Sequence, residues 1–162
     1  MRVEQLEDWL DAMHPRLARF EDVLMPTGWT GDFSRASLEE LEQDALERWP
    51  DRGSFDDAGD PDWVDGAVRY VGEAYLRIGG GGWHVDSDPD SVFSGLPVVT
   101  LDTIEPFPIS PYNLLTALLS RRTGQVLAKV YDGQLLEVQE RRDAEGPDWV
   151  PTRLPVPGDS RS

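Results

Sequence analysis

Residues 60–86 read DPDWVDGAVRYVGEAYLRIGGGGWHVD, and this stretch decides the fold. Asp60-Pro61 predicts a helix start, because an acidic N-cap accepts backbone N–H groups and proline suits the first helical position. Gly66 and Gly72 lack a Cβ and would let another element approach this helix closely. The four glycines 79–82 end the helix. Between these limits, apolar side chains recur at helical spacing and predict the central, best-buried helix: Trp63, Val64, Ala67, Val68, Val71, Tyr75 and Ile78.

Two short strands are expected after the glycines, at residues 83–86 and 98–101, joined by the turn-rich connection SDPDSVFSGLP. Two strands alone are marginally stable, so this sheet must lie on the helices or gain another strand. The predicted fold class is α+β, a mainly helical single domain with a small antiparallel sheet. We expect the globular domain to span residues 1–146 and the proline-rich tail, residues 147–162, to be extended or frayed.

Two helical segments are predicted before the central helix. Residues 6–24 carry one apolar helical stripe, with a kink or break expected near His14 because Pro15 follows it. The string Ser37-Leu38-Glu39-Glu40 matches a capping box, which would open a helix that Pro50 stops. The acidic residues 51–62 are expected to form a loop.

Two further segments are predicted after the sheet. Ser110-Pro111 predicts a helix start, and Gly124 fits a C-terminal cap for that helix. Residues 125–142 fit either a second helix or a hairpin with an Asp-Gly turn. The helix is favoured, because strict apolar–polar alternation fails on the second arm of the hairpin.

Charge excludes several classes of partner. The 162 residues hold 31 acids and 15 bases, a formal net charge of −16. Residues 1–66 hold 18 of the acids and 6 of the bases, so the field belongs mainly to the N-terminal part. Such a surface would repel nucleic acid and anionic membranes and attract cationic partners. There is no cysteine, which excludes disulfides and thiolate chemistry. The N-terminal residues lack the apolar stretch of a signal peptide, so a cytoplasmic location is expected.

No arrangement of reactive side chains predicts an enzyme, and we expect neither catalytic residues nor a cofactor. His84, Asp86 and Asp88 are the candidates for a metal site, but their string fails the EF-hand pattern, and acids also cluster in ordinary turns. The glycine run lacks the spacing of a phosphate loop. Glu73 lies outside the apolar set of the central helix, and an exposed position is favoured over a buried carboxylate with a raised pKa.

Three strings carry a resemblance: YVGEAYLRIGGGGWHVD, GLPVVTLD and ISPYNLLTALLSRRTG, all within residues 63–124. There the chain resembles small acidic bacterial proteins of the type that serve as immunity proteins for polymorphic toxins. The resemblance implies a protein that binds and neutralises a cognate toxin by covering its active site. It supplies no site residues.

The acidic stretch 39–65 is the predicted contact surface for such a partner, which we expect to be a basic toxin domain. Acidic residues would pair with the partner's cations, and one of two tryptophans would anchor the interface. The predicted partner-binding residues are Glu39, Glu42, Trp49, Asp56, Asp57, Asp62 and Trp63. The alternatives are an adaptor or chaperone in a bacterial secretion or signalling complex, and a small metal-dependent enzyme.

Overall fold

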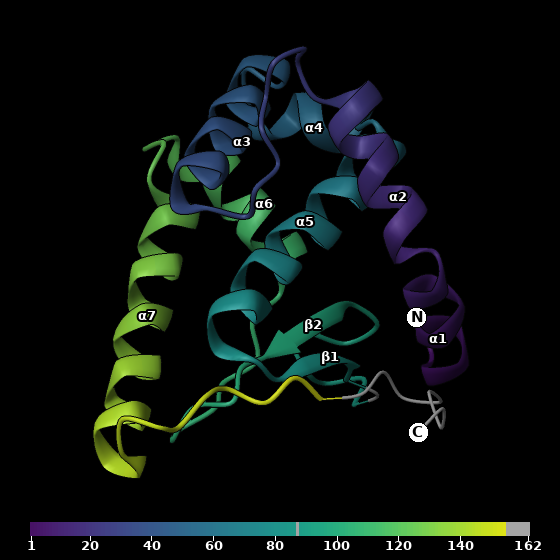
Figure 1. The fold of residues 1–162 in the computed structure, drawn as a ribbon. Helices are drawn as coiled ribbons and strands as arrows, with labels where there is room; N and C mark the ends of the chain where they lie inside the picture. Colours follow the sequence, from purple (N-terminus) through teal and green to yellow (C-terminus); the bar gives the residue numbers. More distant parts are fainter. Residues whose placement is uncertain (87, 155–162) are drawn as a thin grey trace.

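The computed structural model describes residues 1–86 and 88–154. Helices pack around one central helix, and a small sheet lies at one end of the molecule (Figure 1). This confirms an α+β class with a mainly helical domain. The elements within the described residues are α1 (Val3–Asp11), α2 (Met13–Arg19), η1 (Phe20–Leu24, π-helical), α3 (Arg35–Arg48), α4 (Arg52–Ala58), α5 (Pro61–Gly79), β1 (Gly82–Val85), β2 (Pro97–Thr100), α6 (Pro111–Arg121) and α7 (Val126–Glu145).

Helix α5 is the centre of the fold, as its sequence predicts. The Asp60 carboxylate accepts hydrogen bonds from the backbone N–H groups of Asp62 and Trp63, and Pro61 occupies the first turn. Every residue from Gly66 to Leu76 is buried, and α5 contacts α2, η1, α6, α7 and β2. The helix therefore has almost no solvated face over its middle turns.

Close approach at two glycines of α5 is also confirmed. The ring of Phe20 packs directly on Gly66, and the indole of Trp83 packs directly on Gly72. A Cβ at either position would overlap the ring. At the end of the helix, Gly80 and Gly81 adopt φ of 63° and 83°, which reverses the chain into β1.

The sheet gains neighbours on both edges, as its small size requires. Strand β1 pairs with β2 in antiparallel register, from Gly82 opposite Thr100 to Val85 opposite Pro97. On the outer edge of β2, Val99 exchanges two backbone hydrogen bonds with Ile109. On the outer edge of β1, Gly81 pairs with the chain around Arg153. The tail predicted from residue 147 begins with a turn at residues 147–148, and residues 152–154 then run beside Gly81 at the sheet; residues 155–162 of that tail lie outside the described residues.

The N-terminal stripe breaks at Ala12, two residues before His14. Helix α2 begins at Met13, so Pro15 lies in its first turn, where a missing N–H leaves no helical hydrogen bond unmade. The predicted break is therefore correct, and proline is accommodated as part of a new helix.

The predicted capping box at Ser37 is wrong. Helix α3 begins one turn earlier, because Ser34 adopts an extended conformation and its hydroxyl accepts the Ser37 N–H. Ser37 is a buried helical residue whose hydroxyl donates to the Ser34 carbonyl.

The predicted loop at residues 51–62 is also wrong in its first half, which forms α4. The Asp51 carboxylate caps this helix by accepting the Ser54 N–H at 2.7 Å. Phe55 then packs edge-on against Trp49, which gives the short helix a buried contact.

Residues 126–145 form helix α7, so the favoured alternative for residues 125–142 is confirmed. Gly124 does not cap α6. Arg122 instead takes the left-handed conformation there, with φ of 54°, and its guanidinium donates to the carbonyls of Leu46 and Trp49 at the end of α3. Among the described helices, none is both long and apolar enough to cross a bilayer.

Candidate functional site

Three of the predicted partner-binding residues are buried, so their prediction as surface contacts is wrong. Trp49 and Trp63 stack edge-on at 5.0 Å in the aromatic core. The side chain of Glu42 is 0% exposed, and its carboxylate accepts the backbone N–H groups of Val126 and Leu127 at 3.2 and 2.9 Å. Glu42 therefore caps the start of α7, a role that the helical pattern of α3 does not reveal.

The remaining predicted acids are at the surface, and most of them already have cationic partners. Glu39 pairs with Arg35, Asp56 with Arg52, and Asp62 with both Arg16 and Arg19. Asp57 is exposed on α4. Because intramolecular ion pairs neutralise much of this surface, the α3–α4 face is less suited to a cationic partner than its composition indicates.

Glu73 is buried, contrary to the favoured prediction. Its carboxylate accepts a hydrogen bond from the Trp83 indole at 2.8 Å and binds the Arg153 guanidinium through both oxygens, at 2.7 and 3.0 Å. This pairing fixes the tail against α5 and leaves no free carboxylate for acid–base work.

The acidic candidate metal ligands act as turn residues, as in the alternative interpretation of their sequence. The Asp86 carboxylate accepts the Asp88 N–H at 2.9 Å, and the Asp88 carboxylate accepts the Asp90 N–H at 3.0 Å. Hydrogen bonds from the Ser91 hydroxyl and the Asp88 backbone lower the pKa of Asp86. Burial lowers the pKa of His84, with Asp86 opposing that shift. Among the residues described, no three His or acidic side chains are arranged to hold a metal ion.

A continuous stripe of carboxylates runs along α1. Glu4, Glu7, Asp8 and Asp11 form four pairs that are three or four residues apart, on the side opposite the buried Leu6. None of them belongs to an ion pair within residues 1–86 and 88–154. Four like-charged pairs at these spacings each cost about 0.2–0.5 kcal/mol. A cationic surface would relieve this repulsion.

Helix α1 is held firmly enough to present this stripe. The Arg69 guanidinium lies 3.9 Å from the ring of Trp9 and pairs with Asp65 at 2.8 Å. The Trp9 indole donates to the same Asp65 carboxylate at 2.7 Å and packs edge-on against Trp83 at 5.0 Å. These contacts connect α1 to both α5 and the sheet.

The loop between β1 and β2 extends the acidic surface. A groove of about 440 Å³ lies between residues 1–4 and this loop, with Glu4 and Asp86 among its lining residues. Asp88 and Asp90 are exposed farther along the loop. Glu4 and Asp86, which are far apart in sequence, thus border one groove, together with Met1 and Arg2.

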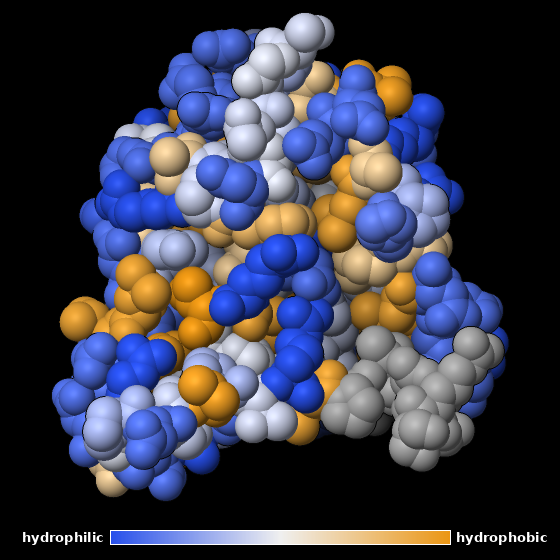
Figure 2. Space-filling model, in the orientation of Figure 1, coloured by the Kyte–Doolittle hydropathy of each residue, from blue (hydrophilic) through white to orange (hydrophobic). Residues whose placement is uncertain are grey.

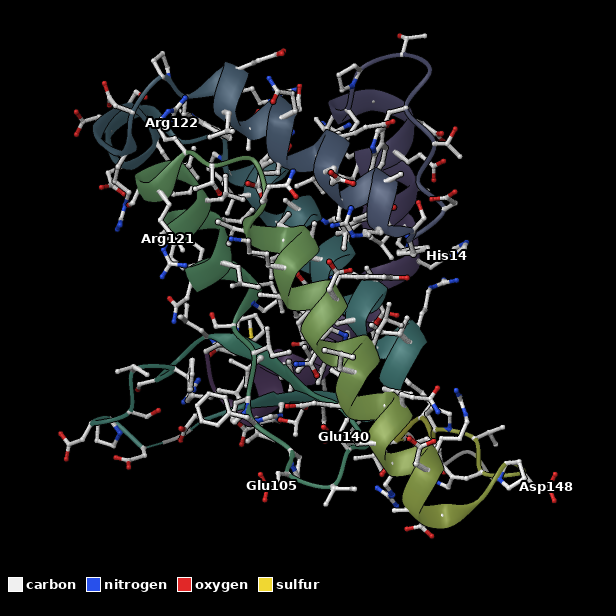
Figure 3. The ribbon with its side chains drawn as sticks, turned by 90° about the vertical axis from the view of Figure 1, so that its left-hand side faces the viewer. His14, Glu105, Arg121, Arg122, Glu140 and Asp148 are labelled. Atoms are coloured by element: carbon white, nitrogen blue, oxygen red, sulfur yellow. The ribbon has the colours of Figure 1, made fainter. Side chains whose placement is uncertain are left out.

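Exposed apolar side chains lie in this loop and against it. Phe107 is 71% exposed and packs edge-on against Phe93, with ring centroids 6.3 Å apart; Val92, in the same loop as Phe93, is 79% exposed. We call the surface of residues 3–11, 88–96, 101–109 and 137–148 the sheet end. Figure 1 shows its helices and the sheet at the lower end, opposite α3, α4 and α6. In Figure 3, Glu105, Glu140 and Asp148 lie toward this end and Arg121 and Arg122 at the other.

No family model, curated protein or solved structure matches this chain.

A second exposed apolar area lies over the middle of α7 (Figure 2), where Leu135 and Leu136 are exposed. It borders the ion pair between Arg35 and Asp132, whose atoms lie 2.9 Å apart. The sheet end is the stronger candidate, because aromatic side chains and carboxylates without ion-pair partners meet there. The helical spacing of the four α1 acids is the sequence signal that could have found it.

Proposed function

We propose that this chain is an immunity-type binding protein, which neutralises a cognate toxin by covering the toxin's active site with the sheet end. The partner would be a basic toxin domain, and nucleic acid would be repelled by the same surface. We also propose a cytoplasmic location, where the chain would bind newly made toxin.

The observation that carries this proposal is the α1 stripe, whose four carboxylates have no ion-pair partner in the described residues. Stable protein interfaces combine a few aromatic or apolar anchors with a polar rim, and Phe107 and Val92 provide the former. The rim is acidic on α1 and on the loop that follows β1. Such charge complementarity raises association rates and excludes wrongly charged partners.

Affinity capture from the source organism tests the proposal with three baits. The first is the wild-type chain, and the second carries Glu4→Gln, Glu7→Gln, Asp8→Asn and Asp11→Asn. The third is a matched control that removes four exposed acids elsewhere, by Asp22→Asn, Glu40→Gln, Glu47→Gln and Asp57→Asn. The captured protein is then assayed for toxicity while the chain is titrated into it.

We expect the wild type and the control to capture one basic protein, whose activity falls to zero at one chain per toxin. Four carboxylates worth about 0.5 kcal/mol each predict a dissociation constant raised about 30-fold in the stripe variant. Raising the salt concentration should weaken the wild-type complex, because exposed charges are screened beyond about 10 Å at 0.1 M. An equal loss in the control variant would contradict the assignment of the surface. A captured protein that stays fully active at saturation would contradict neutralisation and favour the adaptor alternative.

A further inference from the structure

The sheet end contains a hollow of about 580 Å³ between residues 100–106, the start of β1, α7 and the tail. Its apolar lining comes from Trp83, Leu101, Pro106 and Leu154. This volume lies in the range of about 300–1,000 Å³ that small-molecule and cofactor sites occupy. Thr103 belongs to its lining and is buried, and its hydroxyl is the one fully buried side-chain polar atom without a hydrogen-bond partner in the described part of the chain.

A second, smaller hollow lies between two of these segments, the loop that follows β2 and helix α7. Its volume is about 190 Å³, and it is lined by Ile104 and by three glutamates, Glu105, Glu137 and Glu140. Figure 3 shows Glu105 and Glu140 on the loop and the helix that form these walls. No ion pair in the described residues includes any of the three glutamates.

The arginine that follows Glu140 pairs with other carboxylates. Arg141 follows Glu140 directly and lies one turn after Glu137, but it pairs with Asp102 at 2.9 Å and with Glu145 at 3.2 Å. Arg141 also lines the larger hollow, so it stands between the two. The smaller hollow is therefore left strongly negative, while the larger one is mainly apolar.

We infer that the two hollows form one bipartite pocket for a segment of a basic protein partner. An aromatic or aliphatic side chain would fill the larger hollow, and a neighbouring Lys or Arg would enter the smaller one. This inference rests on the proposed function and names the part of the toxin that is recognised. Three carboxylates around one small hollow repel one another, so a cation is favoured there and a carboxylate or phosphate is excluded. The apolar hollow alone would not select for charge.

Two variants test the two hollows separately, and each variant has a matched control. Leu154→Trp fills the larger hollow from its rim, where Leu154 is exposed, and Val23→Trp places the same side chain on an exposed position of η1. Glu137→Gln with Glu140→Gln removes two charges from the smaller hollow, and Glu40→Gln with Glu47→Gln removes two from α3. Thermal unfolding of each variant identifies any that fail to fold.

The probes are N-acetyl-Trp-Arg-amide, N-acetyl-Trp-Glu-amide and N-acetyl-Ala-Arg-amide, titrated against the full chain by calorimetry and by NMR. We expect saturable binding of the Trp-Arg probe with a dissociation constant on the order of 1 mM, and at least about fivefold weaker binding of the other two. Leu154→Trp and the double glutamine variant should each raise the dissociation constant of the Trp-Arg probe by at least about fivefold, and the control variants should leave it unchanged.

Three results would each overturn the inference: no saturable binding of the Trp-Arg probe, binding that neither pocket variant changes, or tighter binding of the Trp-Glu probe. The affinity-capture experiment tests the proposed function independently of these titrations. A toxin that is bound and neutralised equally by the wild type and by Leu154→Trp would leave the proposed function standing while this pocket is rejected.

Discussion

Replacing Glu42 with alanine is expected to lower the free energy of unfolding by about 3 kcal/mol. The buried carboxylate accepts two backbone N–H groups at the start of α7, from Val126 and Leu127. Those N–H groups have no partner within their own helix, and the positive end of the helix dipole favours an anion there. Alanine would leave both donors buried and unsatisfied and would open a cavity between α3 and α7.

The matched control is Glu40→Ala, two residues earlier on the solvated side of α3. We expect a change within about 0.5 kcal/mol for this exposed position. Urea unfolding of both variants provides the comparison. A Glu42 variant as stable as the Glu40 variant would show that α7 does not depend on this cap.

Gly72→Ala is expected to destabilise the protein by about 3 kcal/mol, although alanine is the better helix former. A Cβ at position 72 would overlap the indole ring of Trp83. That ring has little room to move, because its N–H donates to Glu73 and its face meets Trp9 edge-on. The methyl group would therefore force the sheet away from α5.

Gly133→Ala is the counterpart in α7, where nothing lies within 4 Å of the added Cβ. There only the higher helix propensity of alanine contributes, and we expect the free energy of unfolding to rise by about 0.5–1 kcal/mol. Thermal unfolding of the two variants should thus give shifts of opposite sign. Two shifts of the same sign would contradict the close packing of Trp83 on α5.

The central part of the fold could be predicted because its signals are local. The acidic cap at Asp60, the helical apolar spacing and the glycine run lie within one continuous stretch, and the structure agrees with each. The predicted start of α3 is one turn too late, because Ser34 and Ser37 both fit an N-cap and packing of the preceding chain selects the earlier one. In particular, the Phe33 N–H donates to the buried hydroxyl of Tyr70, which positions Ser34 at the helix start.

The candidate site was harder to predict, because the net charge of a sequence does not say where on the folded surface the charged side chains lie. Glu39 and Glu42 look equivalent in the sequence, yet one is paired at the surface and the other is fully buried. The partners that decide this are distant in sequence, as with Arg35 and Asp132. The α1 stripe, in contrast, is a local pattern, but its freedom from ion pairs becomes visible only in three dimensions.

Hydrogen exchange of the chain, free and in complex with the captured toxin, shows whether the partner covers the sheet end. We expect slower exchange in the complex at residues 3–11, 88–96 and 101–109, and unchanged exchange in α3 and α4. Slower exchange confined to α3 and α4, with residues 3–11 unchanged, would contradict the proposed binding surface.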